Sequence, residues 1–175
     1  FPPNKGDKIR SWNILAHLAS RYRVHVGAFI DDPHDWQYTG RIEAIATSTF
    51  FRKLDPRIGK VRSFRSLLTG EPLSCGYYRD RAMQSWVART VRENRIERVF
   101  VYSSSMAQYI PAGLEPGARV VVDFVDIDSD KWRQYAERKS WPMSYIYRRE
   151  ARTLFEVEKE ITSSVDASAF VSGDE

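Results

Sequence analysis

The hydrophobic positions of the chain follow two different periods. Short, continuously apolar runs are typical of buried strands, and apolar residues three or four positions apart are typical of one face of a helix. The short runs predict strands over residues 24–30, 48–54, 98–102, 118–126 and 166–172. The helical spacing predicts helices over residues 8–22, 35–46, 56–68, 83–91, 129–138 and 143–161, and residues 69–78 are expected to be irregular.

Strands that alternate with helices, and that are apolar on both faces, are typical of a parallel sheet covered on both sides. We therefore expect one doubly wound, Rossmann-like α/β domain over residues 1–175. Such a sheet has its first strand near the middle, whereas the first element predicted here is a helix. The expectation is a fragment, whose first strand precedes Phe1 and whose chain continues past Glu175.

The segment before the first predicted helix is a candidate anion site. Gly6 permits a tight turn, and Asp7 can accept hydrogen bonds from the free N–H groups of a helix that starts near Lys8. Those N–H groups and the helix dipole favour a phosphate, to which Lys5 adds positive charge. This segment fits a phosphate contact through Lys5, Gly6 and Asp7, and it fits a plain capped turn equally. The G-x-G-x-x-G and Walker patterns, which would favour the phosphate contact, are absent.

Two predicted strands end in polar residues, and ligands of open parallel sheets bind beyond the carboxyl ends of the strands. Ser103 and Ser104 follow the strand over 98–102, and their hydroxyls suit a helix N-cap. They are candidate substrate contacts at that strand end.

The stretch "DFVDIDSDKW", residues 123–132, holds most of the candidate chemistry. Either Asp123 or Asp126 is expected to face the cleft, depending on the strand register, while Asp128 or Ser129 caps the following helix. Lys131 is a further candidate for contact with a substrate phosphate.

A calcium site is the first suspect for so many carboxylates. Asp126, Asp128 and Asp130 match positions 1, 3 and 5 of an EF-hand loop, and Glu137 matches position 12. Position 6 needs glycine for its sharp turn, but Lys131 stands there. We exclude EF-hand calcium and expect no metal and no cofactor.

Composition narrows the functional classes. Hydrophobic residues make up 42% of the chain and no apolar run is long enough to cross a bilayer, so an ordinary globular domain is expected. The single Cys75 excludes an internal disulfide and fits a reducing, cytoplasmic location. The net charge of +4 favours an anionic partner, namely a phosphate-bearing ligand, an anionic lipid surface or nucleic acid, although surplus surface arginine also explains it.

The basic segment over residues 52–65 alternates cations with apolar residues. An interfacial amphipathic helix has this pattern, and so does an ordinary solvated helix face. No RRM or KH signature is present, so no nucleic-acid partner is expected.

Several motifs together resemble a known family. They are "FPPNKGDKIRSWN", "YSSSMAQY", "VVVDFVDIDSDKWRQYA", "REARTLFEVEKEI" and the terminal "FVSGDE". The chain resembles the N-terminal half of family-4-type glycosyltransferases, and within them the group associated with exosortase/PEP-CTERM exopolysaccharide systems. The resemblance implies a GT-B fold, in which two Rossmann-like domains face a cleft.

The resemblance also implies roles for individual residues. Lys5, Gly6 and Asp7 correspond to the glycine loop beside the donor phosphates and the acceptor. Asp126, or Asp123, falls where the family has a polar residue at the point of sugar transfer, with Ser103 and Ser104 lining the neighbouring strand end. The family's chemistry retains configuration at the sugar and needs no metal.

The expectation is therefore the acceptor-binding half of a retaining glycosyltransferase, which moves a sugar from a nucleotide-sugar donor to a glycan or lipid-linked acceptor. The donor would be held mainly by the protein's own C-terminal domain, so the 175-residue chain alone is expected to be inactive. It would work in the cytoplasm or on the inner face of the membrane. The alternatives are a non-catalytic nucleotide- or phosphate-binding α/β module and a cation-rich domain that binds nucleic acid.

Overall fold

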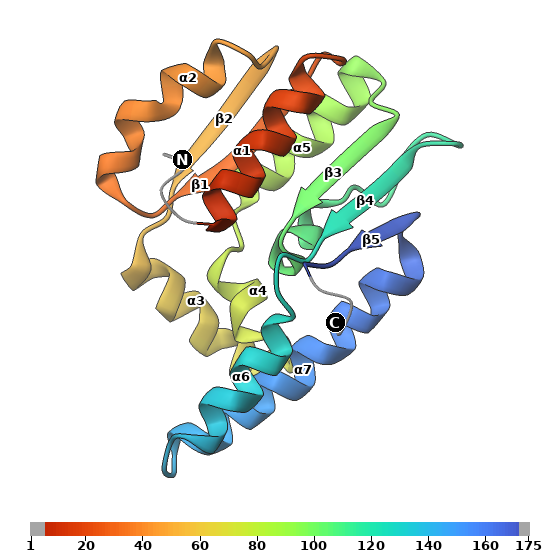
Figure 1. The fold of residues 1–175 in the computed structure, drawn as a ribbon. Helices are drawn as coiled ribbons and strands as arrows, with labels where there is room; N and C mark the ends of the chain where they lie inside the picture. The colour runs from red at the N-terminus through yellow and green to blue at the C-terminus, as the bar shows by residue number, and fades with distance from the viewer. Residues whose placement is uncertain (1–5, 172–175) are drawn as a thin grey trace.

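The computed structural model describes residues 6–171 as an α/β arrangement of parallel strands and helices (Figure 1). The strands are β1 (His25–Ile30), β2 (Ser48–Lys53), β3 (Arg98–Tyr102), β4 (Arg119–Asp123) and β5 (Ala167–Ala169). The α-helices are α1 (Gly6–Ala19), α2 (Thr39–Glu43), α3 (Pro56–Thr69), α4 (Leu73–Tyr77), α5 (Arg81–Asn94), α6 (Asp128–Glu137) and α7 (Met143–Ser164). Two 3-10 helices, η1 (Pro33–Tyr38) and η2 (Ser104–Tyr109), follow β1 and β3.

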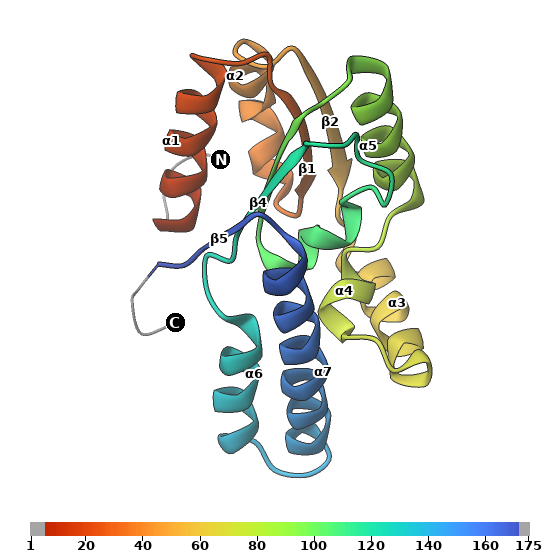
Figure 2. The ribbon, with the colours of Figure 1, turned by 90° about the vertical axis from the view of Figure 1, so that its right-hand side faces the viewer.

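The strands form two parallel sheets rather than one. In one sheet β1 pairs with β2, and in the other the order is β3-β4-β5. Within the described residues no ladder joins β1 to β3, and α1 lies in front of the sheets (Figure 1). Figure 2 shows α1 on one side of the strands and α5 on the other. The predicted α/β class with parallel strands is confirmed.

The predicted strands are all present, but the last two are shorter than expected. The run over residues 118–126 pairs only as far as Asp123, because Val125 adopts a φ of 66° and turns the chain away. The run over 166–172 pairs only over Ala167–Ala169. The first two strands follow their predicted ranges to within one residue at each end.

Three helix predictions need correction. The first helix begins at Gly6, so Gly6 is helical and does not form the tight turn that was expected. The start of this helix is held by tertiary ion pairs of Lys8 and Arg10. Residues 69–78 include the short helix α4, whose first N–H groups are capped by a distant carboxylate. The helix expected over 35–46 is divided into η1 and α2.

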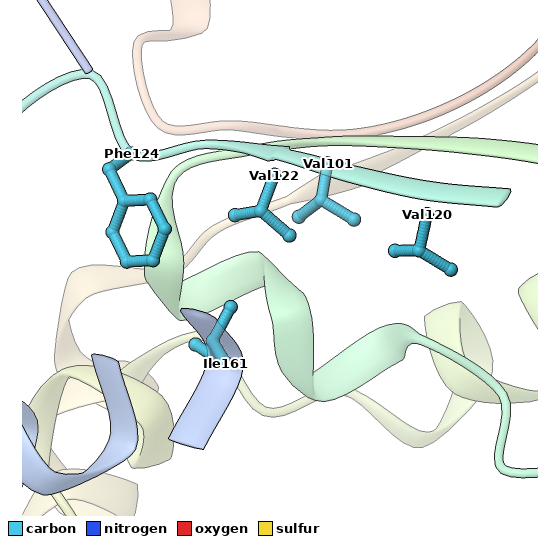
Figure 3. Close-up of a cluster of buried hydrophobic side chains, with 5 residues drawn as sticks. All are labelled: Val101, Val120, Val122, Phe124 and Ile161. Atoms are coloured by element: carbon cyan, nitrogen blue, oxygen red, sulfur yellow. The ribbon is translucent and has the colours of Figure 1, made fainter. Parts of the chain in front are cut away.

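The main buried cluster lies between β3, β4 and the last turns of α7 (Figure 3). Val120, Val122 and Phe124 project from the same face of β4, as the two-residue period of a strand requires, and Ile161 of α7 lies on that side. Val122 is fully buried and Phe124 is 2% exposed. Phe124 also stacks on Phe170, with 5.0 Å between the ring centroids.

The opposite face of β4 carries Asp123, which connects the strand to α1. Its side chain is 1% exposed, and Oδ2 accepts a hydrogen bond from Nε of Arg10 at 3.0 Å and forms an ion pair with Nη2 at 2.9 Å. At the other sheet, Lys8 donates to Asp35 of η1 at 2.7 Å. The first turns of α1 are thus bound to structure that follows β1 and to the end of β4.

We predict a strong energetic coupling between Arg10 and Asp123. Each side chain is the other's charge partner, and Asp123 is too deeply buried to be solvated alone. In a double-mutant cycle with Arg10→Ala and Asp123→Ala, measured by urea denaturation, the coupling should be about 1–3 kcal/mol. Loss of the other contacts of Asp123 cancels in the cycle.

The control is the pair Arg133 and Asp130 on α6, whose charged atoms are 2.7 Å apart but whose side chains are exposed. Exposed pairs of this kind contribute little, so its coupling should be near zero. A coupling for Arg10 and Asp123 no larger than this control would contradict the prediction.

Candidate functional site

A cavity of about 360 Å³ lies where β3 and β4 end and where α6 begins. This is the carboxyl edge at which parallel sheets bind ligands. The walls combine hydroxyl groups, aromatic rings, two carboxylates and one ammonium group. The lining residues are Ser74, Tyr78, Tyr102, Ser103, Ser105, Phe124, Val125, Asp126, Asp128, Lys131 and Trp132.

The loop after β3 supplies the serines. Ser103 has a φ of 80°, which is sparsely populated for a residue with a side chain, and its N–H donates to the Asp123 carbonyl at 2.8 Å. Ser103 lines the cavity and occupies the cap position of η2, but its hydroxyl makes no capping bond, contrary to the sequence expectation. The hydrogen bond to the Asp123 carbonyl fixes the Ser103 backbone in this position.

Ser104 lies behind this wall rather than in it. It is 1% exposed, and its hydroxyl has no partner within hydrogen-bond geometry among the described residues. Burial raises the pKa of Asp128, and the Ser104 side chain opposes this only in small part. Ser103 and Ser105 line the cavity, whereas Ser104 does not.

The loop after β4 separates the two candidate aspartates. Asp123 is buried against Arg10, and its Oδ1 accepts from the Val125 N–H at 3.0 Å. This bond holds the turn at Val125, whose φ of 66° is unusual for a β-branched residue. Beyond the turn, Asp126 lines the cavity with 49% of its side chain exposed. Asp126 is thus the residue of this pair that reaches the cavity.

Helix α6 brings a lysine between two carboxylates. Lys131 donates to Asp126 at 2.6 Å and to Asp128 at 3.3 Å. Burial raises the pKa of Asp128, and the positive charge of Lys131 only partly opposes this. Burial lowers the pKa of Lys131, but the hydrogen bonds and charges of Asp126 and Asp128 outweigh it and leave that pKa raised. Together, Lys131, Asp126 and Asp128 carry a net negative charge when all three side chains are ionised.

Two glutamates of α7 cap the helices that form the cavity walls. Glu150 is fully buried, and it accepts from the N–H groups of Leu73 and Ser74 at 2.6 and 2.9 Å and from the Ser74 hydroxyl at 2.8 Å. Glu158 accepts from the Ser129 N–H at 3.2 Å. The cap of α6 therefore comes from α7, and neither Asp128 nor the Ser129 side chain caps it as expected, because Asp128 turns toward Lys131.

Sequence reasoning missed these glutamates, although the sequence carries a signal for them. Glu150, Leu154, Glu158 and Ile161 stand four, four and three residues apart, which places them on one helical face. Leu154 and Ile161 are core residues, so the glutamates occupy core positions. A carboxylate at such a position needs donors, and helix N-termini provide them.

Among the N-terminal candidates, the described residue Gly6 does not line this cavity. Gly6 opens α1 and is exposed, and the two cations next along the chain, Lys8 and Arg10, are in ion pairs. Lys5 and the side chain of Asp7 lie outside the described residues, so their expected phosphate contact stays a prediction.

Other chemistry is limited within the described residues. Burial raises the pKa of Cys75 to about 11, which removes this buried thiol as a nucleophile. No group of three or more histidine, cysteine or acidic side chains in residues 6–171 is arranged to hold a metal ion. Among those residues, no helix combines the length and the apolar character that crossing a membrane requires.

Comparison of the chain with protein-family models, with curated proteins and with solved structures finds no match.

We predict that Glu158→Gln stabilises the protein at neutral pH. Burial raises the pKa of Glu158, and its Oε2 has no hydrogen-bond partner among the described residues. An acid with a raised folded-state pKa costs stability once it is ionised, so the wild-type stability falls as pH rises from about 4.5 through that pKa. Removing the charge should raise Tm at pH 7 by about 2–4 °C, equivalent to about 1 kcal/mol.

This gain should shrink as the pH is lowered toward the ordinary glutamate pKa, which thermal melts across that range would show. Glu150→Gln is the matched control. Both oxygens of Glu150 accept hydrogen bonds, so an amide there faces other donors and should cost about 1–3 kcal/mol at pH 7. A Glu158→Gln variant that loses stability as Glu150→Gln does would refute the prediction.

Proposed function

We propose that this chain is the acceptor-binding half of a retaining glycosyltransferase. The enzyme would transfer a sugar from a nucleotide-sugar donor to a glycan or lipid-linked acceptor during the synthesis of a bacterial exopolysaccharide. It would act in the cytoplasm. The proposal combines the resemblance of the motifs with one structural observation, the composition of the cavity at the carboxyl edge.

The cavity suits a hydroxyl-bearing ring better than a phosphate. Asp126 and Asp128 are acceptors for sugar hydroxyl groups, and Ser103 and Ser105 both donate and accept. The aromatic side chain of Trp132 offers a flat apolar surface to the C–H face of a ring. Because the carboxylates outnumber the single ammonium group, a free anion would be repelled.

In the proposed reaction, Asp126 accepts a hydrogen bond from the acceptor hydroxyl and orients its oxygen. That oxygen forms a bond to the anomeric carbon of the donor sugar while the bond from that carbon to the diphosphate breaks on the same face. The hydroxyl proton leaves with the diphosphate. Positive charge that develops on the sugar ring is stabilised by the Asp126 carboxylate.

The GT-B fold belongs to this proposal. In that fold the β2-β1 pair and the β3-β4-β5 sheet would belong to one doubly wound sheet. Joining them would require one more parallel strand between β1 and β3. The donor would be held by a second Rossmann-like domain of the same protein, opposite the cavity.

We predict that simple sugars bind to the isolated chain at this cavity. In a titration followed by NMR of the tryptophan indole groups, with Trp132→Phe to assign the resonance, glucose or a related pyranose should shift the Trp132 signal. Asp126→Asn should weaken this binding by about tenfold, because hydrogen bonds to a charged acceptor are the stronger ones. Shifts caused by inorganic diphosphate and not by any sugar would instead support the phosphate-binding module.

We also predict that Asp126→Asn lowers kcat of the enzyme that carries both domains by about 10²–10⁴ while its Tm is unchanged. Asn keeps the shape of the side chain but removes the charge. The matched control is Asp130→Asn on α6, because this carboxylate does not line the cavity and contacts the exposed side chains of Arg133 and Gln134. Near-normal kcat for Asp126→Asn would return this residue to a structural role.

A further inference from the structure

Helix α3 exposes its large apolar side chains instead of burying them. It lies at the edge of the molecule, with α4 on one side (Figures 1 and 2). Four large apolar residues, spaced three or four positions apart, are exposed along its outer side. Their exposed fractions are 51% for Ile58, 65% for Val61, 67% for Phe64 and 91% for Leu68.

The side that faces the protein is made of small residues. Gly59 and Ser66 are the buried residues of α3. A Cβ atom at Gly59 would lie 2.5 Å from the Tyr77 ring of α4, and one at Gly76 of α4 would collide with the Ser66 hydroxyl. The two helices therefore approach so closely that larger side chains cannot stand between them.

Hydrogen bonds fix the orientation of α3 about its own axis. The Ser63 hydroxyl donates to the Leu73 carbonyl at 2.9 Å, and Arg149 of α7 donates to the Ser66 carbonyl at 2.8 Å. Rotating α3 to bury Phe64 or Leu68 would break these bonds and drive bulky groups into α4. The outward direction of the apolar residues is consequently built into the packing.

The same helix is strongly basic. Residues 56–69 contain Arg57, Lys60, Arg62 and Arg65 and no aspartate or glutamate. Arg57, Lys60 and Arg65 are exposed and interleave with the apolar residues, while Arg62 donates to the Arg79 carbonyl. An exposed face that is both apolar and cationic is the pattern of a helix that lies in a membrane interface.

We propose that the face formed by Ile58, Val61, Phe64 and Leu68 docks on the surface of an anionic lipid bilayer. The apolar side chains would enter the boundary between headgroups and acyl chains, and Arg57, Lys60 and Arg65 would contact lipid phosphates. Charge complementarity argues for this occupant. Residues 56–69 expose three cations and contain no carboxylate, so this face attracts a phosphate-rich surface. A single convex helix face also fits a flat, fluid surface without a shaped groove. The inference goes beyond the proposed sugar transfer and does not depend on it.

The test is co-sedimentation with vesicles at low salt. Wild-type protein should pellet with vesicles of phosphatidylcholine mixed with phosphatidylglycerol and stay in solution with phosphatidylcholine alone. Because the attraction is partly electrostatic, raising the ionic strength should release it. The double variant Phe64→Ser/Leu68→Ser should reduce the partition coefficient by about tenfold or more, since it removes two inserted side chains.

Two controls keep the outcome specific. Phe155→Ser removes an apolar side chain on α7 that is 54% exposed, and it should bind vesicles like wild type. Lys60→Glu/Arg65→Glu should lose binding to anionic vesicles while Tm stays within a few degrees, since both side chains are exposed.

Absence of vesicle binding, or equal loss in the Phe155→Ser control, overturns the proposal. Binding to soluble polyglutamate but not to anionic vesicles also overturns it and assigns the face to an acidic protein.

Discussion

The buried carboxylate of Asp123 is the interaction on which the arrangement of the site depends. One oxygen accepts a hydrogen bond from Arg10, forms an ion pair with the same guanidinium group and holds α1 against the strand. The other oxygen accepts from the Val125 N–H and shapes the turn that follows. Its own carbonyl accepts from Ser103, which connects the ends of β3 and β4. Because a carboxylate with 1% exposure is not solvated, the loss of any of these partners lowers the stability of the fold.

A second constraint comes from α7, whose two buried glutamates cap α4 and α6. Capping by a carboxylate satisfies N–H groups that a helix cannot satisfy itself, and it places negative charge at the positive end of the dipole. Through these caps one long helix positions Ser74 and Tyr78 on one wall of the cavity and Lys131 and Trp132 on another. The cavity is therefore assembled from segments that are far apart along the chain.

The two proposals share a structural element, because α4 lies between the cavity and α3. Ser74 of α4 and Tyr78, which follows the helix, line the cavity. Gly76 and Tyr77 of α4 pack against α3. If α3 rests on a bilayer, the packing of α4 against it fixes the position of the cavity relative to the lipid surface. That geometry would suit an acceptor attached to a lipid, whose sugar must reach Asp126 while its chain remains in the membrane.

The sequence by itself determined the α/β class and most element positions, because periods of apolar residues depend only on local geometry and burial. It also located the carboxylate-rich strand end, but it could not decide between Asp123 and Asp126. That choice depended on the turn at Val125 and on Arg10, which is 113 positions away from Asp123. Likewise, the pattern of α3 identified an amphipathic helix, yet only its packing on Gly76 and Tyr77 showed that the apolar side faces outward. Capping of α4 and α6 by Glu150 and Glu158 was equally beyond the sequence, since a carboxylate acquires its donors only when the tertiary structure brings them within reach.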